Sequence, residues 1–221
     1  NPTDDHGHGS NVTGIILATR NNAVGGAGLV EGANLITAKI LNASNSGFTT
    51  HLIAATAYAR LRGARLMNLS LQNYPYNATL DAEFTACNAA GILLVICAGN
   101  QGVDNDVTPN YPSSFPQANI IAVGNHQNTG ERWSGSNYGA TRVDLFAPGR
   151  AIVAPGHSSP TVYFSYTGTS QAAPHVAAIA AAILRVNPTW SAPEVKAAWL
   201  GTVLTAPAFN GICVTGGRLQ V

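Results

Sequence analysis

Three stretches of the chain hold side chains of the kinds used in nucleophilic catalysis. The first is "YTGTSQAAPHVA" (166–177), where a strand pattern gives way to a helical pattern at Ser170. A hydroxyl at the start of a helix lies at the positive end of the helix dipole, where a developing negative charge is stabilised. Serine is also a preferred helix cap, so the motif by itself is more typical of a structural serine.

The second and third stretches offer a base and an amide donor. In "HGSNVTGII" (8–16) His8 begins a helix with an apolar stripe, and a buried helix can hold its first imidazole in a cleft as a general base. In "ICAGNQG" (96–102) an apolar strand ends just before Asn100, and an amide at that place can donate to an oxyanion. Taken singly, these residues are more typical of a solvated histidine and a turn asparagine.

Short apolar runs alternate with helical patterns through the first half of the chain. The predicted strands are 34–41, 64–71 and 92–100, and the predicted helices between them are 51–62 and 80–90. A strand that is buried on both faces is apolar throughout, and parallel strands need helical crossovers. We therefore predict an α/β fold with a mostly parallel central sheet and helices on both of its faces.

The second half begins with a polar loop and ends in helices. A strand is predicted at 119–124, and shorter strands around 143–145, 151–154 and 161–166. The stretch 169–186 is apolar or small almost all round, which is typical of a helix through the core, and a further helix is predicted at 191–204. Pro174 falls within or just after the first turn of the core helix, where its missing amide hydrogen costs little.

The composition argues against two classes of partner. Apolar residues make up 46% of the 221 residues and charged residues only 10%, against roughly 25% charged in an ordinary soluble domain. The net charge is +1 and no basic run occurs, so no nucleic acid partner is expected. The apolar run at 176–184 falls well short of the roughly 20 residues that a membrane span needs, so no span is expected.

The start of the chain, its cysteines and its sequons bear on processing. The chain begins "NPTDD", without Met or a signal-peptide pattern, and we expect a piece of a longer product. The three cysteines allow one disulfide with a free thiol, or three buried thiols: Cys87, Cys97 and Cys213. Of the Asn-x-Ser/Thr sequons, those at Asn42 and Asn77 stand in loop-like sequence and would accept glycan in a secreted protein.

The three catalytic-type motifs occur together in one known family. "HGSNVTG", "AGN" and "GTSQAAPHVA" have the order and approximate separations found in the subtilisin-like serine proteases, the subtilase family. The stretches "NLITAKIL", "MNLSL", "YPSSFPQANIIAVG", "DLFAPG" and "GGRLQV" also resemble strands, turns and the last element of that family. The resemblance covers essentially the whole chain and implies a single subtilisin-like peptidase domain over 1–221. It implies a serine endopeptidase that cuts extended polypeptides through an acyl-enzyme.

The resemblance also implies a role for each residue of the motifs. Ser170 would be the nucleophile, and His8, not His6, the base that takes its proton and later protonates the leaving amine. Asn100 would join the backbone amide of Ser170 in holding the oxyanion. A second candidate function is a non-catalytic subtilase-like module whose groove binds a peptide or a protein partner.

Substrate-binding residues follow from the same resemblance. The segment with Asn68, Ser70 and Leu71 resembles the family's strand that pairs with an extended peptide substrate, and Gly99 would line the same site. The sequence departs from the family at 72–73, where Gln-Asn replaces two glycines. Gln72 is therefore expected to narrow the pocket for the residue before the cleaved bond.

One member of the catalytic triad has no match in the chain. In this family an Asp on an early apolar strand orients the histidine, whereas Asp4 and Asp5 stand in a polar approach only a few residues before His8. Asp144 matches a structural position of the family instead. We expect the catalytic Asp on an upstream segment of the same precursor, cleaved off or present as a separate chain, and we expect activity to require it.

A metal and a location are implied as well. "RNNAVGG" (20–26) resembles the family's calcium loop, with Asn22 as the implied side-chain ligand, and the alternative is a plain turn. The reaction itself requires no cofactor. Four other histidines have no partners at ligand spacing and are expected to be structural: His51, His126, His157 and His175. The expected location is outside the cell or in the lumen of the secretory pathway.

Overall fold

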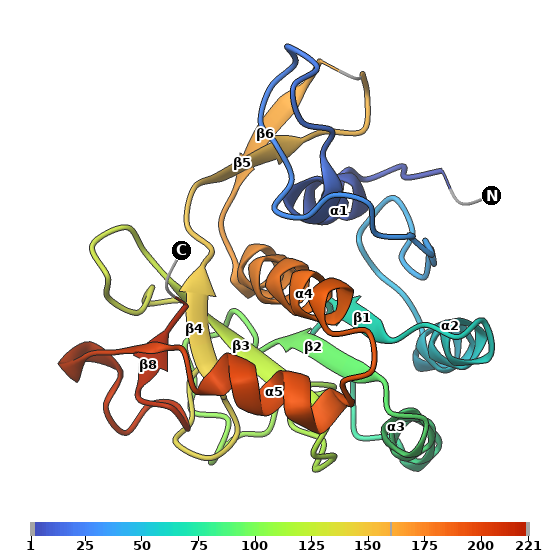
Figure 1. Ribbon diagram of the computed structural model, residues 1–221. Coiled ribbons are helices and arrows are strands. Elements are labelled where there is room, and N and C mark those ends of the chain that lie inside the picture. Colours follow the sequence, from blue (N-terminus) through green and yellow to red (C-terminus); the bar gives the residue numbers. More distant parts are fainter. Residues whose placement is uncertain (1–2, 160, 220–221) are drawn as a thin grey trace.

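The computed structural model describes residues 3–159 and 161–219, and its centre is a six-stranded sheet with strand order β1-β2-β3-β4-β8-β7 (Figure 1). Neighbours from β1 to β8 are parallel, and β7 is antiparallel to β8. The strands are β1 (Leu66–Leu69), β2 (Leu93–Cys97), β3 (Ile120–His126), β4 (Leu145–Pro148), β7 (Leu204–Thr205) and β8 (Gly217–Arg218).

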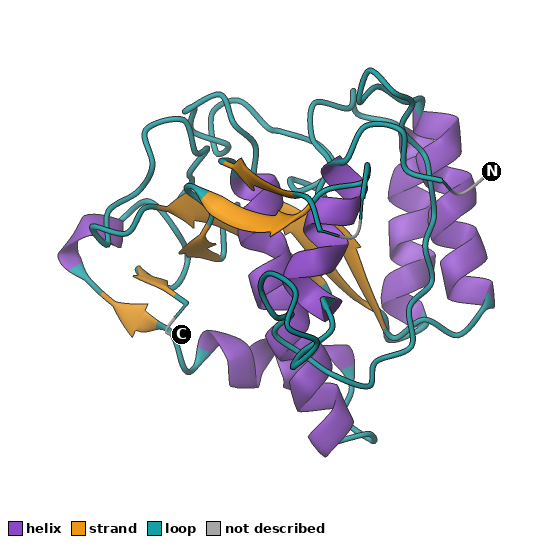
Figure 2. Cartoon of the chain, turned by 90° about the horizontal axis from the view of Figure 1, so that it is seen from above, coloured by secondary structure: helices purple, strands orange, loops and turns teal. Residues whose placement is uncertain are grey.

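Helices cover both faces of this sheet, as predicted. α4 (Thr169–Val186) and α5 (Ala192–Leu200) lie on one face, and α2 (Thr49–Leu61) and α3 (Ala78–Ala89) on the other. Strand β2 is buried throughout because its alternate side chains, at 93, 95 and 97 and at 94 and 96, enter the two separate cores. Figure 2 shows helices to either side of the strands when the molecule is viewed from above.

A smaller unit lies beside α4, at one edge of the molecule. It consists of α1 (His8–Leu17) and a hairpin of β5 (Ile152–Pro155) with β6 (Tyr163–Tyr166) (Figure 1). The hairpin approaches α1 closely because Gly14 has no side chain: a Cβ there would lie 2.3 Å from Cδ of Pro155. The short 3-10 helix Pro207–Phe209 packs under the far end of the sheet, with Phe209 stacked on Phe146.

The central helix α4 has the predicted bounds, and its proline has a structural consequence. Pro174 is the sixth residue of α4 and cannot donate to the carbonyl of Ser170, four residues earlier. The hydroxyl of Ser70, which follows β1, donates to that carbonyl at 2.7 Å instead. The hydrogen bond that proline removes from the helix is thus replaced by one from the end of a strand.

The predicted strand at 34–41 is wrong. These residues form an extended loop without secondary structure, and Leu35 and Ile36 are 52% and 40% exposed. The other predicted strands and helices of the chain are present, with ends shifted by a few residues. The apolar run at 34–41 lacks a neighbouring strand for its backbone within the described residues, and an extended segment needs such a ladder to be a strand.

The structure also shows whether the three cysteines form a disulfide. All three thiols are free and buried, so the second of the two arrangements is the one found. Burial raises the pKa of Cys87 to about 12 and that of Cys97 to about 11. Within residues 3–159 and 161–219 no helix is both long and apolar enough to cross a membrane.

Candidate active site

The first functional side chain is placed by the start of α1. His8 is the first residue of this helix, and Gly7 precedes it with φ +95°, a left-handed conformation that favours glycine. The apolar stripe holds the helix through Val12 and Ile15, which are buried. Burial lowers the pKa of His8, the neighbouring His6 imidazole lowers it further, and Asp4 acts in the opposite direction. The imidazole is therefore neutral at neutral pH and able to accept a proton.

The second functional side chain stands at the start of α4. Ser170 is the second residue of the helix and is 8% exposed. Its Oγ donates to the carbonyl of Ser70 at 3.4 Å, while the Ser70 hydroxyl donates back to the carbonyl of Ser170. This reciprocal pair joins the carboxyl end of β1 to the first turn of α4.

Asn100 is fixed in one orientation beside this turn. Its Oδ1 accepts hydrogen bonds from the backbone amide of Thr169 at 2.8 Å and from the Thr169 hydroxyl at 2.9 Å. Its Nδ2 therefore faces the other way, 3.2 Å from where a Cβ of Gly168 would lie. Within the described residues this Nδ2 has no hydrogen-bond acceptor, so it remains able to donate to a ligand.

The two helix starts face each other. α1 packs against α4 (Figure 1). Gln171 donates from Nε2 to Oδ1 of Asn11 at 3.2 Å, and both side chains are buried. Gln171 follows Ser170, and Asn11 is one turn after His8. The fold thus brings the first turn of α1, which begins at His8, into contact with the first turn of α4, beside which Asn100 lies. The hydroxyl of Ser170 donates to Ser70, and no hydrogen bond joins it to the His8 imidazole among the described residues.

A cavity of about 1150 Å³ opens beside His8 and runs along β1. One wall is the extended segment 32–42, and the other is 64–71 together with parts of α1, α2 and α4. Strand β1 is the last strand of the sheet on this side, and no backbone hydrogen bond joins it to 32–42 within the described ranges. Ser70, which follows β1, and His8 both line this cavity.

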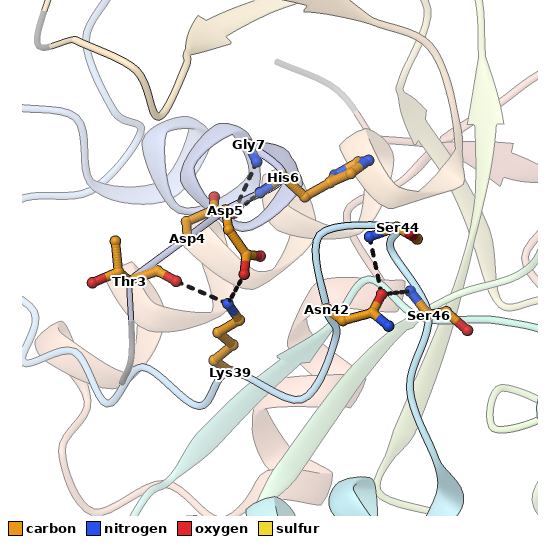
Figure 3. Close-up of polar contacts among 9 residues, drawn as sticks. All are labelled: Thr3, Asp4, Asp5, His6, Gly7, Lys39, Asn42, Ser44 and Ser46. Atoms are coloured by element: carbon orange, nitrogen blue, oxygen red, sulfur yellow. Dashed lines mark hydrogen bonds and ion pairs between the residues drawn. The ribbon is translucent and has the colours of Figure 1, made fainter.

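Two acids lie near His8, and both have other partners. Oδ1 of Asp4 accepts from the backbone amides of His6 and Gly7, and its Oδ2 accepts from that of Ser10. Figure 3 shows Asp5 paired instead with Lys39, which also donates to the carbonyl of Thr3. Neither acid forms a hydrogen bond with the His8 ring.

The third acid considered from the sequence is remote from the site. Asp144 immediately precedes β4, so it lies at the amino end of a sheet whose carboxyl ends carry Ser70 and Asn100. Its carboxylate pairs with Lys196 at 3.1 Å and accepts from the amide of Ala122 at 2.7 Å. These contacts make it a link between β3, β4 and α5.

The expected substrate-binding residues border the Ser70–Ser170 pair. Asn68 donates from Nδ2 to Oγ of Ser70 at 3.0 Å, and the carbonyl of Leu71 accepts from the Cys97 thiol at 3.2 Å. Oε1 of Gln72 is buried and has no hydrogen-bond donor within the described residues. Gly99 has φ +118°, and a Cβ there would lie 2.4 Å from Nδ2 of Asn137.

A network of amide side chains supports these residues and was missed in the sequence. Asn110 donates from Nδ2 to Oδ1 of Asn73 and to Oε1 of Gln101, and Asn137 donates to the same Gln101 oxygen. Asn137 also donates to Asn105, which donates to the carbonyl of Ala98 just before the Gly-Asn turn. In the sequence, the only sign of this network is the high frequency of Asn and Gln in the loop after β2.

The structure of the candidate calcium loop fits a bound cation poorly. Asn22 is exposed, and its Oδ1 accepts from the amide of Val24 at 3.0 Å, as in a plain turn. The described residues contain no group of three or more His, Cys, Asp or Glu side chains able to hold a metal ion. The loop therefore fits poorly to calcium, and calcium at Asn22 stays a prediction.

Comparisons with known proteins agree with the motifs. The chain matches the subtilase family over residues 1–216. It is 34% identical over 198 residues to alkaline elastase YaB of Bacillus sp. (strain YaB), covering 89% of this chain and 50% of that protein. It is 36% identical over 195 residues to subtilisin Savinase of Lederbergia lenta, covering 87% of this chain and 68% of that protein.

A solved structure extends the likeness to the fold. The crystal structure of a cold adapted subtilisin-like serine proteinase has a TM-score of 0.82 and 27% sequence identity, and the match covers 98% of this chain and 73% of that one. The chain spans about half the length of alkaline elastase YaB and of the M-protease of Shouchella clausii. A family match over nearly the whole sequence, with the same α/β architecture, leads to one conclusion: this chain belongs to the subtilase family.

Proposed function

We propose that this chain is the larger part of a serine endopeptidase that hydrolyses extended polypeptides. The observation that carries the proposal is the arrangement of Asn100 beside Ser170. Because Thr169 occupies Oδ1 of Asn100, its Nδ2 is free to donate, and the backbone amide of Ser170 stands at the start of the helix beside which Asn100 lies. Two donors at a helix start are suited to a tetrahedral oxyanion.

The proposed reaction gives each of these residues one role. Oγ of Ser170 attacks the substrate carbonyl carbon, and its proton passes to the neutral imidazole of His8. The oxyanion accepts hydrogen bonds from Nδ2 of Asn100 and from the amide of Ser170. The imidazolium protonates the leaving amine as the carbon–nitrogen bond breaks. Water, deprotonated by His8, then hydrolyses the acyl-enzyme and restores the Ser170 hydroxyl.

Substrate binding falls to the segment 68–72 and to Gly99. An extended peptide is expected to pair with the backbone after β1, as in other strand additions. The buried, unpartnered Oε1 of Gln72 offers an acceptor at the edge of this segment, where the family has glycine. Gln72 is therefore proposed to narrow the pocket for the residue before the cleaved bond.

We propose that an upstream segment of the same precursor completes the site. The cavity along β1 has an open sheet edge on one side and the extended segment 32–42 on the other. A strand laid there parallel to β1 would end at the same edge of the sheet as Ser70. A carboxylate following that strand would reach the imidazole of His8, which no acid among the described residues orients.

The alternative is a module that binds peptides without cutting them. It is favoured by the Ser170 hydroxyl, which donates to Ser70 and not to His8 among the described residues. Replacing the orienting Asp of a triad lowers turnover roughly 10,000-fold, so a chain that functions without one would bind more than it cuts. Secretion is proposed for either function, on the likeness to the bacterial subtilisins.

One experiment separates the two functions. The chain is produced alone and with its natural upstream segment and is treated with a fluorophosphonate probe. Its intact mass is then measured by mass spectrometry. An endopeptidase gains the mass of one label, more rapidly with the upstream segment, and loses it in Ser170→Ala. Absence of label with the upstream segment present would exclude the endopeptidase. The upstream sequence itself should contain an apolar strand that ends in Asp-Ser/Thr-Gly.

A further inference from the structure

The backbone on either side of His8 is held by a single carboxylate. Oδ1 of Asp4 accepts from the amides of His6 at 3.0 Å and Gly7 at 2.8 Å, and its Oδ2 accepts from that of Ser10 at 2.7 Å. These donors lie before and after His8 in the sequence. Helix α1 has no acid in its first turn and no side-chain cap of its own. Asp4 therefore serves as the cap of the helix from outside it.

The residues next to His8 would otherwise leave it poorly fixed. Both are glycines, which lose more conformational freedom on folding than any other residue. Gly7 is required by its φ of +95°, and a Cβ there would lie 2.6 Å from Nδ1 of His157. Gly9 lies beside the carboxylate: a Cβ there would be 3.5 Å from Oδ2 of Asp4. The carboxylate supplies the rigidity that this Gly-His-Gly sequence lacks.

We propose that Asp4 is a positioning residue for the general base, which fixes the first turn of α1 and adds a negative charge next to the imidazole of His8. The proposal rests on the proposed endopeptidase function. Asp4 is not offered as the orienting member of the triad, because three backbone amides already occupy its two oxygens. It acts on the imidazole through the backbone and through its field.

The charged groups around His8 define what this field can do. On its own segment, Asp4 raises the pKa of His8 and His6 lowers it. The nearby Asp5 side chain is paired with Lys39, so that the two charges largely offset one another, and His157 approaches Gly7 from the β5–β6 connection. The first turn of α4 and the end of β1 contribute no ionisable side chain other than the Ser170 hydroxyl. Asp4 is thus the one unpaired negative charge beside the base among the described residues.

The neighbouring acid gives a matched control. Asp4→Asn and Asp5→Asn each remove one negative charge, one residue apart. The first also weakens the clamp, because the NH2 group that replaces one carboxylate oxygen cannot accept from a backbone amide. The second affects an exposed carboxylate whose partner is Lys39. Asp4→Glu keeps the charge while displacing the carboxylate.

The test measures kcat and kcat/KM against pH for the protease that contains its upstream segment. Asp4→Asn is expected to lower kcat by up to about 100-fold, the scale of a 1 Å misplacement of a catalytic group, and to move the acid limb of kcat/KM to lower pH. Asp5→Asn should move the limb less than Asp4→Asn does, because the Lys39 ammonium that it leaves unpaired is exposed and screened by solvent. Asp4→Glu should lower kcat without moving the limb.

Three results would overturn the proposal. The first is an Asp4→Asn enzyme with unchanged kcat. The second is a fall in the kcat of Asp4→Asn without a shift of the acid limb of kcat/KM. The third is a shift of that limb in Asp5→Asn as large as the shift in Asp4→Asn. If Asp4→Asn does not fold, as judged by circular dichroism, Asp4→Ser provides a neutral cap for the same measurement. Failure of the proposed function is recognised separately, since wild-type protein would then take no fluorophosphonate label at Ser170.

Discussion

The hydrogen bond between Ser70 and the carbonyl of Ser170 can be tested without any assay of activity. Pro174 deprives this carbonyl of its partner within α4, and the Ser70 hydroxyl supplies the replacement at 2.7 Å. Both serines are nearly buried, at 9% and 8% exposure. Ser70→Ala therefore leaves a buried carbonyl without a donor, and it removes the acceptor of the Asn68 side chain.

The expected loss of stability follows from the free energy that an unsatisfied buried polar group costs. A buried acceptor without a partner costs about 1–3 kcal/mol, so Ser70→Ala should lower the free energy of unfolding by about 2 kcal/mol. For a chain of this length, 1 kcal/mol changes Tm by roughly 2–4 °C, which gives a fall of about 4–8 °C. Exposed Ser44 is the control, and Ser44→Ala should stay within about 0.5 kcal/mol of wild type.

A second substitution identifies the cause. Pro174→Ala restores an amide hydrogen that can donate to the Ser170 carbonyl along the helix. In that background Ser70→Ala should cost about 1 kcal/mol less than in the wild type, a coupling that a double-mutant cycle in urea measures directly. If Ser70→Ala costs less than about 0.5 kcal/mol, or costs the same in both backgrounds, the explanation through Pro174 is refuted.

Three further predictions concern the site. Asn100→Ala should lower kcat by about 100- to 1000-fold with KM little changed, in steady-state assays of the protease with its upstream segment; an unchanged kcat would exclude the amide as oxyanion donor. Gly99→Ala should destabilise the fold more than Gly63→Ala in urea unfolding. Both glycines have positive φ, but only the Cβ at 99 would meet another side chain, that of Asn137. Because burial lowers the pKa of His8, the imidazole of the chain by itself should titrate, in an NMR titration, below the ordinary histidine pKa of about 6.5; a pKa above that value would contradict a neutral base.

The architecture, and the places of Ser170, His8 and Asn100 at the ends of elements, could be predicted from sequence because each depends on local pattern. The catalytic roles of these residues were implied by the family resemblance and stay predictions. The run 169–186 is apolar or small on nearly every side, and only a buried helix satisfies that pattern, so its bounds were predicted correctly. β2 was recognised as buried on both faces for the same kind of reason. The start of a helix or the end of a strand then located Ser170, His8 and Asn100.

Contacts between distant segments could not be predicted in this way. The run 34–41 has the apolar residues of a strand, but strand formation depends on a neighbour that the pattern does not reveal. The link from Asn73 through Asn110 to Gln101 joins residues far apart in sequence, each of which reads locally as a turn residue. The capping of α1 by Asp4 was missed because it acts across three intervening residues.

The open edge of β1 has a practical consequence for anyone who produces this chain. A strand edge with unpaired backbone groups recruits other strands, and here it borders an apolar wall that includes Val12, Ile16 and Leu69. Copies of the chain made by themselves can pair along that edge, so aggregation in the expression host is the expected outcome. A peptide with the upstream sequence, added during refolding, would compete for the same edge and act as a chaperone specific to this protein.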